Sequence, residues 1–350
     1  MSSKPRFVGE CRHVKLNEIC SKGKSSLRQK DVINDGPYSV YGASGVVGTT
    51  SDYQNEIPYV AVIKDGAGVG RASACEPMTS VLGTMQALIP NPNVERDYLL
   101  YLVRSLRLGE GFSGSTIPHI YFKDYGKIEV PLPSFEAQKR IVSQLGLIEA
   151  QIEQAEAQTT QLDQLVKSRF VEMFGDPVTA VSDITLGEVA NMKAGKTTTA
   201  KTIHDVYAPG LYPCYGGNGF RGYSAEPTHE GVFPLIGRQG ALCGNVQIAH
   251  GTFRATEHAV VVDCKTSCEP VWLFHYLKYD NLGRLATGAA QPGLSLKDLK
   301  LVPVQLPPKD RQVEFISFVS QVDKSRFIAQ QQIEKLQMLY DSLAQDYFGD

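Results

Sequence analysis

The chain has 350 residues, too many for one ordinary domain and about right for two if a domain has roughly 150 residues. Hydrophobic residues make up 42% and charged residues 21%, which excludes a disordered, collagen-like or disulfide-scaffold protein. The net charge of −2 argues against a wholly basic nucleic-acid binder but leaves room for a local basic face. No stretch approaches the ~20 apolar residues of a membrane span. The start has no apolar signal-peptide core, and seven cysteines without a CxxC pair indicate a reducing cytoplasm.

The sequence repeats itself when it is shifted by 174 positions. The segment YGASGVVG at 41–48 aligns with YGGNGFRG at 215–222, and SGSTIPHIYFKD at 113–124 aligns with TGAAQPGLSLKD at 287–298. A single offset that holds from Tyr41 to Asp176 of the first copy indicates a tandem duplication.

Each copy begins with a glycine-rich globular part, residues 1–134 and residues 179–308. β-Branched runs between turns are typical of buried strands, and short helices interrupt them. We predict strands at 59–63 and 259–262 and helices at 98–106 and 271–279. Each globular part is therefore expected to be mixed α+β.

Each copy ends in a long predicted helix, residues 135–178 and residues 309–350. Apolar side chains alternate at spacings of four and three, the pattern of a coiled-coil seam. The seam residues are Ile141, Leu145, Ile148, Ile152, Leu162, Val166, Phe315, Val319, Val322, Ile333, Leu336 and Tyr340. About 39 residues at ~1.5 Å each span roughly 58 Å, longer than a small domain is wide. We therefore expect the two helices to pack on each other, the alternative being an amphipathic helix packed on its own domain.

Charge is divided between the globular parts and the helices. The net charge is +2 for residues 1–134 and +1 for 179–308, but −3 for 135–178 and −2 for 309–350. Residues 4–30 hold eight Lys or Arg against two Glu. This cluster is either a phosphate-contacting patch or a solvated face.

Enzyme motifs are incomplete. The segment 194–197, AGKT, lacks the glycine that a phosphate-binding loop requires five positions before Gly195, where Ala190 stands. Residues 65–70 do not have GxGxxG spacing, so we predict a tight turn between strands. Cys264 and Cys268 have no second ligand pair at zinc spacing. We predict no catalytic residue, no metal site and no cofactor in this chain.

Taken together, these features resemble the specificity subunit of type I restriction–modification systems. The resemblance covers essentially the whole chain and includes the proline-rich entries to the helices at 130–142 and 304–316, and the Phe-Gly-Asp at the end of each helix. One departure is Ile63-Lys64-Asp65, which replaces the Gly-Arg-Gln at 237–239.

The resemblance implies that each globular part is a target-recognition domain that reads one half of a split sequence in double-stranded DNA. The two helices would form an antiparallel coiled coil between them. The subunit itself would not be an enzyme. Two modification subunits would methylate adenines with S-adenosylmethionine, and two restriction subunits could add ATP- and Mg-dependent cleavage. The alternatives are a duplicated enzyme with a site between the halves, or a scaffold or silent recombination donor.

Base edges are read by Arg, Lys, Asn and Gln, with Ser, Thr or His as adjuncts. In the first domain the candidate DNA-binding residues are Lys22, Lys24, Ser44, Lys64, Ser115 and His119. In the second they are Lys196, Asn218, Arg221, Arg238, Gln239 and Gln291. A structural or merely solvated role is the alternative for each of them.

Overall fold

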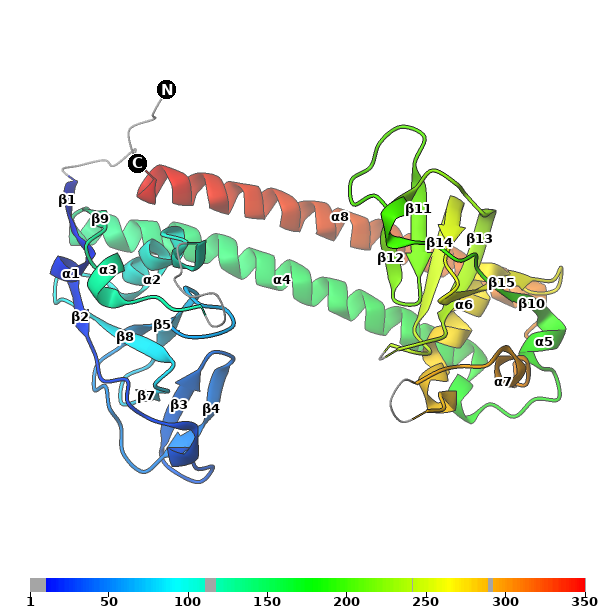
Figure 1. The fold of residues 1–350 in the computed structure, drawn as a ribbon, viewed down its shortest axis with the longest axis horizontal. Coiled ribbons are helices and arrows are strands. Elements are labelled where there is room, and N and C mark those ends of the chain that lie inside the picture. Colours follow the sequence, from blue (N-terminus) through cyan, green and yellow to red (C-terminus); the bar gives the residue numbers. More distant parts are fainter. Residues whose placement is uncertain (1–10, 111–117, 241, 289–291, 350) are drawn as a thin grey trace. The chain divides into compact units, whose positions relative to one another are not determined.

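The computed structural model describes residues 11–110, 118–240, 242–288 and 292–349. It divides into two compact units, each built from sheet and helix, which confirms the predicted α+β class (Figure 1). The first unit is Met1–Glu156 with Gln331–Asp350, and the second is Ala157–Gln330. No described helix is both long and apolar enough to cross a membrane.

The two long helices are α4 (Phe135–Phe174) and α8 (Lys309–Phe348). Each helix contributes to both units, because the division between the units falls inside it. Gly175 follows α4 with a φ of +82°, a left-handed conformation that glycine adopts without strain at a helix end. The division into residues 1–134, 135–178, 179–308 and 309–350 stays a prediction, since the boundaries between the two units fall after Glu156 and after Gln330.

The described part of the first unit contains several small sheets. Their strand orders are β1-β9, β2-β8-β5-β6 and β4-β3-β7. The strands are β1 (Arg12–Lys15), β2 (Cys20–Lys22), β3 (Tyr38–Gly42), β4 (Gly45–Thr50), β5 (Tyr59–Ile63), β6 (Ala72–Cys75), β7 (Ser80–Val81), β8 (Met85–Pro90) and β9 (Glu129–Leu132). The short helices are α1 (Leu16–Ile19), α2 (Arg96–Ser105) and α3 (Phe122–Tyr125). All five residues of β5 are buried, as expected of a continuous apolar run at the centre of a core.

The second unit has one six-stranded sheet with the order β10-β15-β13-β14-β11-β12. The strands are β10 (Ala190–Ala194), β11 (Tyr212–Gly216), β12 (Gly219–Ser224), β13 (His229–Gly237), β14 (Val246–Ala255) and β15 (Ala259–Cys264). The short helices are α5 (Leu186–Val189), α6 (Pro270–Tyr279) and α7 (Leu296–Lys300). The predicted strands and both predicted short helices are confirmed, although α2 starts two residues earlier than expected, because Glu95 caps it by accepting a hydrogen bond from the Tyr98 N–H at 2.7 Å.

A proline explains why the two units differ in their sheets. Strand β14 is continuous from Val246 to Ala255, and the equivalent positions of the first copy are divided between β6 and β7. Pro77 lies in that gap and cannot donate a backbone hydrogen bond, and Met78 has a φ of +54°. The interruption therefore divides one large sheet into two smaller ones.

A buried glutamine joins each long helix to the short helix of its domain. Gln138 is 1% exposed. Its Oε1 accepts a hydrogen bond from the backbone N–H of Glu95, at the start of α2, at 2.9 Å. Its Nε2 donates to the carbonyl oxygens of Asn93 and Pro133, at 3.1 Å each. One side chain thus connects α4, the segment before α2 and the segment after β9.

Gln312 makes the same three hydrogen bonds in the second unit. Its Oε1 accepts from the Glu269 N–H at 2.8 Å, and its Nε2 donates to the carbonyl oxygens of Ser267 at 3.0 Å and Pro307 at 2.9 Å. Gln312 is completely buried. The repeated network explains why glutamine occurs at this position in both copies.

The long helices pack on each other within each unit. In the second unit Asp163 pairs with Arg326 at 2.7 Å, while Arg169, further along α4, pairs with Glu314, earlier in α8, at 3.3 Å. The two segments are therefore antiparallel. In the first unit Tyr347 donates a hydrogen bond to the side chain of Gln144.

Several predicted seam residues belong to the hydrophobic cores of the two units. Seven seam residues are buried and five are half-buried. The buried ones are Ile141, Leu145, Ile148, Val166, Phe315, Val319 and Val322. The half-buried ones are Ile152, Leu162, Ile333, Leu336 and Tyr340.

We predict that Gln312→Leu lowers the unfolding free energy of the second unit by about 2–3 kcal/mol, because it leaves a buried N–H and two carbonyl groups without partners. Trp272, the single tryptophan of the chain, is completely buried in the second unit, so its fluorescence during urea unfolding reports on that unit. Gln321→Leu, at an exposed position of α8, is the matched control. Equal unfolding midpoints for the two variants would contradict the proposed role.

His275 gives the second unit a pH-dependent stability. Its ring packs against Phe315 and its Nδ1 lies 3.2 Å from the Tyr279 hydroxyl. Burial, with smaller contributions from Lys278 and Arg326, lowers the pKa of His275 to about 3. An unfolded histidine has a pKa of about 6.5, so the unfolded chain binds a proton that the folded chain does not between these values. Stability is therefore complete above about pH 6.5 and falls as the pH decreases toward 3.

We predict that His275 lowers the unfolding free energy of the second unit by about 1.4 kcal/mol when the pH decreases from 7.5 to 5.5. His275→Phe should remove this loss, whereas His250→Gln, at an exposed position, should keep it. Urea unfolding followed by Trp272 fluorescence at the two pH values measures the difference. The same loss in His275→Phe and in the wild-type protein would refute the assignment.

Candidate nucleic-acid interface

Two loops are paired in the same way in both units. In the first, residues 64–66 and 118–120 are joined by backbone hydrogen bonds of 3.0 and 3.1 Å. In the second, residues 238–240 and 292–294, which are the equivalent positions of the repeat, are joined by bonds of 2.9 and 3.0 Å. The repeated motifs that first revealed the duplication are thus partners in space.

Close backbone packing explains the repeated glycines of these loops. A Cβ on Gly70 would lie 2.2 Å from the backbone nitrogen of Gly109, and one on Gly244 would lie 2.3 Å from that of Gly283. Both glycines also have positive φ values, +85° and +89°. The loop at 65–70 is therefore a tight turn between β5 and β6, as the sequence predicts.

Lys64 and His119 are brought together in the first domain. The Ile120 N–H donates to the Lys64 carbonyl at 3.0 Å, and His119 Nδ1 lies 2.7 Å from Asp65 Oδ1. All of these groups belong to the paired loops. Ser115 lies outside the described residues.

The other first-domain candidates lie on different elements. Ser44 is exposed in the turn between β3 and β4. Lys22 ends β2, with its Nζ 5.7 Å from the centre of the Phe122 ring. Lys24 is exposed, and its backbone N–H donates to Asn55 Oδ1 at 3.0 Å. These three positions are outside the paired loops that carry Lys64 and His119.

The second-domain candidates gather around the turn that joins β14 to β15. Arg238 donates its backbone N–H to the His258 carbonyl at 3.1 Å, and Gln239 Oε1 lies 2.7 Å from His258 Nδ1. The backbone N–H of Lys196 donates to the carbonyl of Ala255, at the end of β14, at 3.0 Å. The structure thus brings Lys196, Arg238 and Gln239 to one turn.

The two remaining described candidates lie on the neighbouring hairpin. Asn218 is exposed in the turn between β11 and β12, and the adjacent Gly217 is in close contact with Gly237. Arg221 is exposed on β12, and its side chain lies against Gly216. Gln291 lies outside the described residues.

A buried arginine holds the loop that carries Lys196. Arg254 is 8% exposed. Its Nε donates to Thr198 Oγ1 at 2.9 Å, and its guanidinium also donates to the Thr197 carbonyl at 3.2 Å and the Glu226 carbonyl at 3.0 Å. Because Thr197 and Thr198 belong to the loop after Lys196 and Arg254 belongs to β14, these hydrogen bonds attach the loop to the strand.

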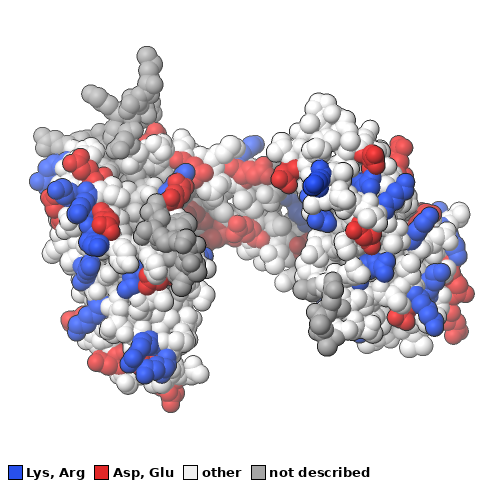
Figure 2. Space-filling model, viewed as in Figure 1, with Lys and Arg blue, Asp and Glu red and all other residues white. Residues whose placement is uncertain are grey.

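Arg238 has unused hydrogen-bonding capacity. Its Nε is buried and has no hydrogen-bond partner within the described ranges. A buried donor without a partner costs free energy, which a bound acceptor would recover. On the face shown in Figure 2, Lys and Arg are spread across both sheet-bearing domains, and Asp and Glu gather along the long helices.

Sequence reasoning missed three residues in these loops, namely Asp65, Glu257 and His258. Asp65 and His258 bond to the candidates His119 and Gln239, and Glu257 accepts from the Thr198 N–H at 3.0 Å. The sequence signal for His258 was its position directly before the predicted strand at 259–262. Its contact with Gln239 could not be inferred without the strand order.

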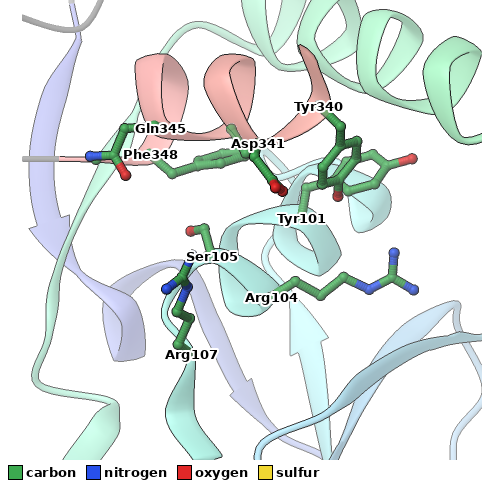
Figure 3. A pocket seen from close by; sticks show the side chains of 10 residues that line it. Tyr101, Arg104, Ser105, Arg107, Tyr340, Asp341, Gln345 and Phe348 are labelled. Carbon is green, nitrogen blue, oxygen red and sulfur yellow. The ribbon is translucent and has the colours of Figure 1, made fainter. Parts of the chain in front are cut away.

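A cavity of about 160 Å³ in the first unit lies between α2 and the end of α8 (Figure 3). Ser105 and Ala344 line it. The equivalent positions of the other copy hold Tyr279 and Phe170, whose rings pack 5.3 Å apart in the second unit. The cavity is therefore the space that small side chains leave at a repeated packing site.

Among the described residues, no cluster of His, Cys, Asp or Glu could hold a metal ion.

Comparisons with known proteins agree with this arrangement. A model of the type I restriction modification DNA specificity domain matches residues 10–164 and again residues 180–338. The specificity subunit of the Escherichia coli type I restriction enzyme EcoprrI is 44% identical over 140 residues, which is 40% of this chain and 35% of that protein. The chain thus spans about a third of the length of the curated relatives that it matches.

Two solved structures share the fold. The S subunit of a type I restriction–modification system from M. genitalium is 19% identical with a TM-score of 0.64, over 99% of this chain and 100% of that one. A chain from work on complex assembly and conformational transition of the type I R-M system is 17% identical with a TM-score of 0.56, over 96% and 97%. With two family matches that include both sheet-bearing domains and most of both long helices, the chain belongs to the family of the type I restriction modification DNA specificity domain.

Proposed function

We propose that this protein is the DNA-reading subunit of a type I restriction–modification complex, in which each domain reads one half of a bipartite site. The paired loops carry the proposal. Their backbone hydrogen bonds are the same in both domains, but Lys64 and Asp65 in the first correspond to Arg238 and Gln239 in the second. The same loop backbone with different hydrogen-bonding side chains suits two domains that bind different DNA sequences.

The side chains are of the kinds that contact DNA. Arg238 and Gln239 supply forked and amide groups for base edges, and Lys64 and Lys196 supply charge for phosphates. The low net charge of the chain is compatible with this role, because partner subunits also contact DNA.

The long helices set the distance between the half-sites in this proposal. Gln138 and Gln312 fix each domain to the start of the helix that follows it. A domain held this way cannot turn freely on its helix. The helices then act as a spacer, as dimer geometry does in simpler DNA-binding proteins.

We assign catalysis to partner subunits. Two modification subunits would dock on this chain and methylate adenines with S-adenosylmethionine, and two restriction subunits would cleave DNA with ATP and Mg. This chain would hold no cofactor and act in the cytoplasm. The work on complex assembly of the type I R-M system, in which a chain of the same fold occurs, supports an assembly role. No observation favours the duplicated enzyme, the scaffold or the silent recombination donor.

We predict that co-expression of this chain with its modification subunits yields one bipartite methylated motif in host DNA. Sequencing of methylated adenines measures the motif. Modification subunits expressed without this chain are the control and should leave the motif unmethylated. Methylation without a bipartite motif, or no complex on copurification, would reject the proposal.

A second prediction concerns the spacer. Inserting one heptad into each long helix, after Glu156 in α4 and after Gln330 in α8, keeps the seam in register. The unspecified gap of the motif should lengthen while both half-sequences stay unchanged, because the paired loops are untouched. A changed half-sequence would contradict the division of labour between loops and helices.

A further inference from the structure

Gln239 lies at the end of a chain of polar contacts. Its Oε1 lies 2.7 Å from His258 Nδ1. His258 Nε2 in turn lies 3.5 Å from Glu257 Oε1, and the other carboxylate oxygen accepts a hydrogen bond from the Thr198 N–H at 3.0 Å. One ring nitrogen of the histidine thus faces the loop at 238–240, and the other faces the carboxylate that accepts from the loop after Lys196.

In the structure the amide oxygen of Gln239 faces His258, so its Nε2 faces away from the histidine. An amide oxygen can only accept, so this contact is a hydrogen bond in the states of His258 in which Nδ1 carries a hydrogen. The two N–H bonds of Gln239 Nε2 have no acceptor among the residues that the structure describes. Since Gln239 is exposed, these N–H bonds are available to a ligand, and a free glutamine would offer either end.

The equivalent position of the first domain has the opposite hydrogen-bonding character. Asp65 stands there, with its Oδ1 2.7 Å from His119 Nδ1. An ionised carboxylate only accepts hydrogen bonds. Each domain therefore has a histidine against the same loop position, but the group that it holds is a carboxylate in one domain and an amide in the other.

We propose that His258 is a positioning residue that holds Gln239 as a hydrogen-bond donor toward a base edge in the second half-site. This inference rests on the proposed function. A donor selects the acceptors of the major groove, O6 and N7 of guanine, N7 of adenine or O4 of thymine, and is mismatched with the amino group of cytosine. His258 contributes to specificity without touching DNA, because it prevents the amide from turning over.

The test compares Gln239→Glu, His258→Ala and His258→Asn in the full-length chain, co-expressed with the modification subunits. Gln239→Glu keeps an oxygen for His258 but presents the other oxygen outward. One position of the second half-sequence should change from a base read through an acceptor to a base read through an amino group, N4 of cytosine or N6 of adenine, with a preference on the order of tenfold. His258→Ala should make that same position degenerate, while Asn, whose amide N–H can replace Nδ1–H, should preserve it.

The first half-sequence is the internal control and should be unchanged in all three variants, which also shows that each variant folds and assembles. If the wild-type chain gives no bipartite motif, the proposed function fails and this inference fails with it. If the wild-type motif appears and all variants keep its second half, only this inference is wrong. Equal degeneracy in His258→Ala and His258→Asn, or loss of methylation at every site, would also overturn it.

Discussion

In each repeat, the hydrogen bonds of one buried glutamine hold the globular domain on its long helix, and the spacing of the two domains depends on this attachment. The buried side chains of Gln138 and Gln312 each bond one backbone N–H and two carbonyl groups. An unsatisfied group of this kind costs about 1–3 kcal/mol, so the domain and the helix are held in one orientation. A reader on a loosely attached domain would sample many positions along DNA, and a fixed gap between half-sites would have no structural basis.

Duplication has preserved this attachment and let other parts diverge. The paired loops keep their backbone bonds in both domains, although Asp65 and Gln239 present different chemistry. The sheets have diverged further, since Pro77 divides a strand that is continuous as β14. The cores have diverged in size, because Phe170 fills a place that Ala344 leaves open. Changes are tolerated where they do not touch the glutamine network.

Much of the fold follows from periodicity in the sequence. The 4,3 spacing located both long helices, and the β-branched runs located β5 and β15, because these elements bury continuous apolar faces. The constant offset that indicated a duplication is matched in the structure, where equivalent loops have the same backbone hydrogen bonds. Ile63-Lys64-Asp65 departs from its counterpart in sequence, yet the backbone there is paired in the same way.

Contacts that depend on strand order could not be predicted. His258 reaches Gln239 only because β15 pairs with β13, and no local pattern encodes that register. The division of β6 from β7 required knowing that Pro77 falls on a strand rather than in a loop. The DNA-binding role of the individual residues stays a prediction, since their side-chain types are also common on solvated surfaces.

The first unit is discontinuous, being completed by Gln331–Asp350 after the whole of the second unit in the sequence. Phe348 packs against Tyr98 in its core, with ring centres 5.6 Å apart. During synthesis the second unit, Ala157–Gln330, can therefore close before the first has all of its parts. The N-terminal part of the first unit would leave the ribosome before the segment of α8 that completes its core has been synthesised. Truncation near residue 330 would therefore destabilise the N-terminal unit, although the cut lies far from it in the sequence.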